Sequence, residues 1–172
     1  MTVEMVMGWL QQYGAFAIFV IVLLEYMNLP GFPAGIIMPM AGVWAHYGGI
    51  SFLAVLFITE IAGLLGSWIL YFLGYFLGAP LLDKWEEKFP KHRASIDRAL
   101  TFLRERGCWG LFVAKLLPMF RTLIPVPAGV IRMDFWRYTL YSAMGVFVWN
   151  LVLVGAGFFV GQSVLPELAR IM

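Results

Sequence analysis

Four ionisable side chains stand in apolar sequence: Glu25, Glu60, Lys115 and Arg121. If this sequence is buried in a bilayer, each charge near the bilayer centre costs roughly 2.5–3.5 kcal/mol on insertion scales. Four unpaired charges would cost on the order of 10 kcal/mol, which rivals the whole stability of an ordinary domain. We therefore expect these side chains to be paired, hydrated, neutralised or near an interface.

Lys115 and Arg121 are the candidates for binding an anion. The planar guanidinium fork of arginine suits bidentate contact with phosphate. Arg121 also lies between Pro118 and Pro125, where an interrupted helix is expected to expose backbone amides. A half-helix beginning near Pro127 would direct the positive end of its dipole toward the same place.

The two acids suggest coupling to protons. We expect Glu25 to lie opposite Arg121 in the empty protein, with Glu60 as a second candidate acid. An arriving phosphate would displace a carboxylate, which in a low dielectric should take up a proton. A purely structural ion pair is the alternative. By contrast, Arg132, Asp134 and Arg137 flank the start of the last apolar run and are expected to be interfacial.

The composition indicates an integral membrane protein. Of 172 residues, 62% are hydrophobic and 13% are charged, which lies outside the range of soluble globular chains. The uncharged runs 26–59, 61–82 and 138–166 each exceed the roughly 20 apolar residues that span a bilayer. Residues 1–10 lack the basic region of a signal peptide, so the first apolar segment is expected to remain as an anchor.

Charge and cysteine content exclude several classes of function. A net charge of +2 without a basic tail argues against a nucleic-acid partner. One cysteine and two histidines without ligand-like neighbours predict no metal site, disulfide framework or cofactor. Residues 83–106 hold seven of the twelve Lys and Arg residues, which places this loop in the cytoplasm. Its second half predicts an amphipathic surface helix that stops at Gly107.

A weak internal repeat organises the chain. The segment LPGFPAGII, Leu29–Ile37, aligns with LIPVPAGVI, Leu123–Ile131, and Gly74 aligns with Gly157 after a loop of different length. Interrupted hydrophobic segments at matching places in two halves are typical of transporter binding sites. We predict an all-α membrane protein with transmembrane helices and two opposed re-entrant hairpins. The re-entrant backbone is expected at Pro33, Gly35, Pro118, Pro125, Pro127 and Gly129.

These elements predict one membrane domain over residues 1–172. Its first half covers about residues 5–82, the loop covers 83–106 and the second half covers about 107–161.

The ordered motifs LLEYMNLPGFPAGIIMPMAG, AGLLGSWILYFLGYFLG and FVAKLLPMFRTLIPVPAGVIRM resemble the DedA family of bacterial membrane proteins, which is related to the VTT domain of eukaryotic scramblases. The resemblance implies a multi-pass protein of the bacterial inner membrane that moves lipid across the bilayer. It implies undecaprenyl phosphate or phosphatidylethanolamine as substrate, with proton coupling in some members. By position, Glu25 and Arg121 match an acid and an arginine of the family, and Lys115 replaces another arginine.

Two positions depart from the family pattern. Gly35 and Ser67 stand where many members have acids. Glu60 is the residue expected to replace a lost carboxylate, which leaves proton coupling and the identity of the lipid open.

Three other functions remain as alternatives. They are a non-transporting assembly or homeostasis factor, a small-solute/proton antiporter and, least favoured, a lipid phosphatase. The last lacks a recognisable nucleophile with its base, so we expect no enzyme. The sequence leaves open whether the chain forms a homo-oligomer.

Overall fold

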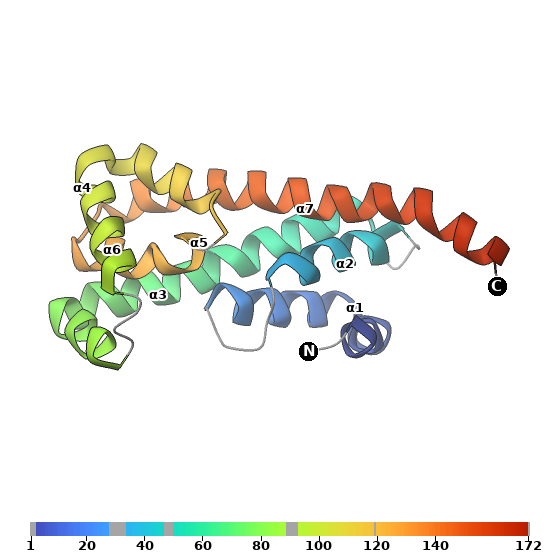
Figure 1. The fold of residues 1–172 in the computed structure, drawn as a ribbon, viewed down its shortest axis with the longest axis horizontal. Helices are drawn as coiled ribbons and strands as arrows, with labels where there is room; N and C mark the ends of the chain where they lie inside the picture. The colour runs from blue at the N-terminus through green and yellow to red at the C-terminus, as the bar shows by residue number, and fades with distance from the viewer. Residues whose placement is uncertain (1–2, 28–33, 47–49, 89–92, 119, 172) are drawn as a thin grey trace. The chain divides into compact units, whose positions relative to one another are not determined.

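A computed structural model describes residues 3–27, 34–46, 50–88, 93–118 and 120–171 (Figure 1). Over these ranges the chain is helical and contains no strand, which confirms the predicted all-α class. The helices are α1 (Val3–Tyr26), α2 (Ala34–His46), α3 (Phe52–Lys88), α4 (Arg93–Lys115), α5 (Phe120–Leu123), α6 (Pro125–Val130) and α7 (Phe135–Ile171).

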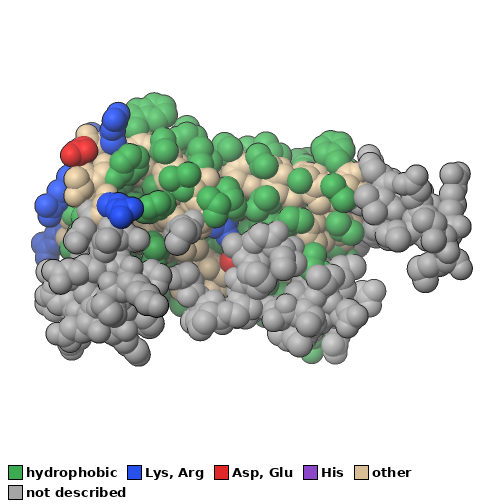
Figure 2. Space-filling view, viewed as in Figure 1, with side chains coloured by type: hydrophobic (Ala, Val, Ile, Leu, Met, Phe, Trp, Pro, Cys, Tyr) green, Lys and Arg blue, Asp and Glu red, His purple; other side chains and the backbone are tan. Residues whose placement is uncertain are grey.

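Two of the described helices are long and apolar enough to cross a bilayer. The apolar stretches are Phe52–Gly78 in α3 and Phe135–Val160 in α7, and Tyr13–Tyr26 in α1 is a shorter apolar helix. Figure 2 shows hydrophobic side chains covering the visible face of α7, whereas Lys and Arg gather around α4. Side chains such as Val152 and Phe159 are more than half exposed. An apolar exterior of this extent suits contact with lipid.

Glycine breaks α4 at the predicted place. Gly107 has φ 56°, in the left-handed region that glycine enters without steric cost. The first segment of α4 therefore stops at Gly107 as expected, but a second helical segment continues at once to Lys115. The polar region predicted as a loop is more helical than expected, because α3 continues past Gly78, with φ 59°, to Lys88.

The break predicted around Pro118 is present. α4 ends at Lys115 and α5 begins at Phe120, with turn residues between them. The amide of Leu117 donates to the carbonyl of Ala114, which tightens the end of α4 into a narrower turn. Arg121 is thereby placed on a new helix after a change of chain direction.

The prolines at 125 and 127 open the short helix α6. This half-helix begins at Pro125, close to the expected start near Pro127, and both prolines lie in its first turn, where a missing amide donor costs little. Ile124 before them has helical angles, φ −61° and ψ −29°. The chain from Phe120 to Val130 is therefore nearly continuous helix, and the interruption lies before it.

In the first half, Pro33 lies outside the described residues. Gly35 lies in the first turn of α2, and Pro39 is accommodated inside that helix. Re-entry of these segments into a membrane stays a prediction.

The helices form two compact units. The first contains residues 1–63 and 147–172, and the second contains residues 64–146. The boundaries fall inside α3 and α7 rather than between the two halves predicted from the repeat. The single membrane domain over residues 1–172 stays a prediction.

Matching glycines hold the short helices against the long ones in both units. In the second unit, a Cβ at Gly74 of α3 would overlap the carbonyl oxygen of Val126 in α6. In the first unit, a Cβ at Gly157 of α7 would overlap the carbonyl oxygen of Pro39 in α2. Gly74 and Gly157 are the residues that the repeat aligned. Each unit therefore packs the interrupted segment of one half against the long helix of the other.

Candidate anion-binding site

Lys115 ends α4 with its side chain inside the second unit. The residue is 1% exposed, and its Nζ donates to Oγ of Ser67 at 2.8 Å. Gly145 of α7 leaves room for the lysine stem, because a Cβ at this position would meet Lys115 Cβ. Three helices thus fix the ammonium: α4 supplies it, α3 supplies the hydroxyl partner and α7 supplies the space.

Two tyrosines support Ser67 from the side. Tyr138 is fully buried and donates from its hydroxyl to the carbonyl oxygen of Ser67 at 3.1 Å. Its ring stacks on Tyr71 with centroids 4.4 Å apart. This stack holds the start of α7 against α3, so the serine hydroxyl that meets Lys115 is held at a fixed position.

Arg121 is fully buried in α5, at 0% exposure. Its amide donates to the carbonyl of Leu117 at 3.0 Å, which anchors α5 to the end of α4. Ile124 and Val126, which follow it, are also fully buried. Burial of a guanidinium in such surroundings requires compensating charge or hydrogen bonds.

The candidate acids belong to the first unit. Glu25 is 2% exposed near the end of α1. The adjacent Tyr26 donates from its hydroxyl to Oδ1 of the buried Asn150 at 3.3 Å. Glu60 is half-buried on α3. A carboxylate, a phenol and an amide are therefore buried in the first unit.

The structure thus groups the predicted site residues by the sign of their charge. Lys115 and Arg121 lie in the second unit, while Glu25 and Glu60 lie in the first. The predicted pairing of Glu25 with Arg121 stays a prediction. Among the described residues, no three His, Cys, Asp or Glu side chains are grouped to hold a metal ion.

Sequence reasoning missed the roles of Ser67, Tyr138 and Asn150. Ser67 was noted as the place of a lost acid, whereas the structure makes its hydroxyl the partner of Lys115. A polar residue in an apolar run, such as Asn150 between Trp149 and Leu151, was the available signal for the others. Such residues in membrane spans usually hydrogen-bond across helices.

The VTT domain model matches residues 32–159 of this chain. Undecaprenyl phosphate transporter A of Staphylococcus aureus is 30% identical over 158 residues, covering 90% of this chain and 77% of that protein. The uncharacterized membrane protein YkoX of Bacillus subtilis is 27% identical over 163 residues, covering 93% and 72%. An alkaline phosphatase-like protein of Lactococcus lactis is 26% identical over 165 residues, covering 93% and 77%.

No solved structure matches the chain. The family match covers most of the chain, including the interrupted segments and both buried cations. The chain therefore belongs to the VTT-domain family of membrane proteins, the DedA family.

Proposed function

We propose that this protein is a lipid transporter that moves a lipid with an anionic head group across the bacterial inner membrane, in which it is a multi-pass protein. Undecaprenyl phosphate is the first candidate substrate, supported by the name of the Staphylococcus aureus relative. A phospholipid such as phosphatidylethanolamine, whose zwitterionic head group carries an anionic phosphate, is the second. The observation that carries the proposal is the full burial of Lys115 and Arg121 in one compact unit.

The two cations supply complementary contacts for a phosphate head group. The Arg121 guanidinium presents a planar fork that fits two phosphate oxygens, whereas Lys115 presents a point charge that adapts its direction. Both contacts gain strength in surroundings of low dielectric. A phosphate in this unit would therefore be held by charge and by directed hydrogen bonds together.

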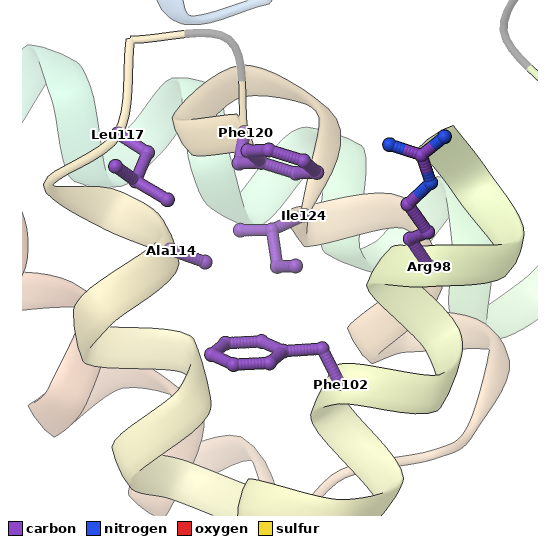
Figure 3. A pocket seen from close by; sticks show the side chains of 6 residues that line it. All are labelled: Arg98, Phe102, Ala114, Leu117, Phe120 and Ile124. Carbon is purple, nitrogen blue, oxygen red and sulfur yellow. The ribbon is translucent and has the colours of Figure 1, made fainter. Parts of the chain in front are cut away.

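An apolar cavity beside α5 fits the lipid's hydrocarbon. It measures about 200 Å³ and is lined by Phe102, Ala114, Leu117 and Ile124 among others. Figure 3 shows these side chains around the space, with Arg98 at its rim. Phe120 and Ile124 line the cavity from the same short stretch that carries Arg121. Hydrocarbon in the cavity would therefore contact residues that are close neighbours, in the sequence, of Arg121, which we assign to the head group.

Proton coupling is assigned to Glu25 and Glu60. Glu25 is buried among apolar helices, where protonation removes the cost of a charge. Glu60 is half-buried on α3 in the same unit and is the second acid of the proposal. In the proposed cycle, a carboxylate takes up a proton when the phosphate arrives and becomes charged again when the phosphate leaves.

Lipid translocation in proteoliposomes tests the proposal. The rate at which a labelled phosphate lipid changes leaflet is compared for the wild type, Arg121→Ala and Arg121→Lys. Arg104→Ala, an exposed change on α4 with the same loss of charge, is the control. We expect Arg121→Ala to abolish transport, Arg121→Lys to restore part of it and the control to match the wild type. Equal transport by Arg121→Ala would remove this residue from the mechanism.

A lipid phosphatase is the second candidate. The 2.8 Å contact between Lys115 and Ser67 has the composition of a serine–lysine dyad, in which a neutral lysine activates the serine. A relative from Lactococcus lactis carries a phosphatase-like name. Release of inorganic phosphate from the same proteoliposomes distinguishes the two functions. Release that Ser67→Ala abolishes supports the phosphatase, whereas transport without release supports the transporter.

A further inference from the structure

Another pocket of the second unit lies between α3 and the turn that joins α6 to α7. It measures about 450 Å³, within the range of small-ligand pockets. Its lining combines four aromatic rings with one cation and one anion: Tyr71, Phe72, Tyr75, Phe135, Arg132 and Asp134. The cations assigned to transport, Lys115 and Arg121, are not part of this lining.

Arg132 adopts a backbone conformation that favours glycine. Its φ is 52°, and it stands directly after the C-cap Ile131 of α6. The amide of Arg132 donates to the carbonyl of Gly129 at 2.9 Å, and that of Met133 donates to Ala128 at 3.1 Å. This is the hydrogen-bond pattern of a Schellman motif, whose left-handed position is usually glycine. An arginine held in this conformation at a pocket indicates a function for its side chain.

Neighbouring contacts fix the Arg132 side chain over the pocket. Its Cζ lies 5.4 Å from the centroid of the Tyr75 ring, a cation–π distance. The Tyr71 hydroxyl donates to the carbonyl of Met133 and so holds the turn against α3. Asp134 caps α7, because its Oδ1 accepts from the amide of Arg137 at 2.9 Å. A guanidinium and a carboxylate are therefore held on one rim.

The pocket lies where both apolar spans end. Tyr75 is close to the end of the apolar stretch Phe52–Gly78, and Phe135 begins the stretch Phe135–Val160. Tyrosine and tryptophan concentrate at the level of lipid head groups, and the exposed Trp136 follows the same pattern. A lipid head group can therefore reach the pocket at this level.

We propose that this pocket binds the head group of a zwitterionic phospholipid. Arg132 takes the phosphate, while Asp134 and the rings of Phe72 and Phe135 take the ammonium group. The formal charges of Arg132 and Asp134 cancel, which matches a head group of zero net charge and disfavours a phosphate monoester. The site goes beyond the proposed transport, because it is separate from Lys115 and Arg121 and holds a lipid whether or not one is moved.

Native mass spectrometry of the purified full chain tests the site. The protein is titrated with phosphatidylethanolamine or phosphatidylglycerol of identical acyl chains, with and without excess inorganic phosphate. Arg132→Gly removes the guanidinium and suits the backbone, so its melting temperature should not fall below that of the wild type. Asp134→Asn keeps a good helix cap and removes only the charge. Arg137→Ala is the control, because it loses a charge outside the pocket lining.

The wild type should retain phosphatidylethanolamine more strongly than phosphatidylglycerol. Arg132→Gly should weaken retention of phosphatidylethanolamine about tenfold, the effect of one charge-assisted contact. Asp134→Asn should reduce the preference between the two lipids, and Arg137→Ala should retain lipid as the wild type does. Inorganic phosphate should not compete, since it lacks the ammonium and the bilayer anchor.

Three results would overturn the site. They are unchanged retention in Arg132→Gly, equal retention of both lipids by the wild type, and displacement of lipid by inorganic phosphate. Loss of transport in Arg121→Ala with unchanged lipid retention in Arg132→Gly would contradict the lipid site at Arg132 alone. Unchanged transport in Arg121→Ala with weakened lipid retention in Arg132→Gly would contradict the proposed transport alone.

Discussion

The contact between α6 and α3 makes a strong prediction about Gly129. A Cβ added there would overlap the carbonyl oxygen of Tyr71 and crowd the amide of Tyr75. Both obstacles are backbone atoms, which cannot move aside as a flexible side chain can. Gly129→Ala should therefore push α6 away from α3, and α5, which carries Arg121, should move with it.

The change in the free energy of unfolding of Gly129→Ala follows from two opposing effects. Overpacking a core typically costs about 1–3 kcal/mol, and overlap with backbone puts Gly129→Ala at the upper end of that range. Alanine regains up to about 1 kcal/mol of helix propensity. The net destabilisation is about 2 kcal/mol, which lowers the melting temperature of a chain of this size by about 4–8 °C.

Gly155→Ala is the matched control in α7. No atom lies within 4 Å of an added Cβ at this position, so only the gain in helix propensity remains. Its melting temperature should rise by about 1–4 °C. Thermal unfolding of the purified variants in one detergent measures both changes, and lipid translocation should fall in Gly129→Ala only. A Gly129→Ala protein as stable as Gly155→Ala would refute the close packing of α6 on α3.

Three other changes have defined outcomes. Ser67→Ala should lower the free energy of unfolding by about 2 kcal/mol, because the buried ammonium of Lys115 loses its hydroxyl partner; unchanged denaturant midpoints would contradict the contact. Ser67→Asp should bind that ammonium itself and slow lipid translocation, whereas faster translocation would oppose the proposed role of the cation. Glu25→Gln should remove the pH dependence of translocation, since it cannot exchange a proton, while a pH profile like that of the wild type would exclude Glu25 from coupling.

Much of the helical framework was predictable from sequence because its signals are local. Long apolar runs predicted the spans in α3 and α7, and Gly107 was correctly expected to stop a helix. The break near Pro118 also followed from proline chemistry. A half-helix near Pro127 was expected as well, and α6 begins at Pro125, because proline interrupts a helix in its interior but is tolerated in its first turn.

The candidate site was predictable in its charges and not in its contacts. Lys115 and Arg121 were selected because charge in apolar sequence needs compensation, and both are buried. The hydroxyl of Ser67 is 48 residues from Lys115, and no local pattern relates the two. Arg132 was expected to be merely interfacial, since sequence carries no sign that its backbone would enter the left-handed region.

Direct binding of a polyprenyl phosphate tests the central claim most simply. Native mass spectrometry would compare the wild type with the double variant Lys115→Met and Arg121→Met, which keeps unbranched side chains at both positions and removes both charges. Two lost charge-assisted contacts predict roughly a 100-fold loss of bound lipid in a variant that remains folded. Equal retention of the lipid by a folded double variant would contradict the assignment of these two buried cations to the head group.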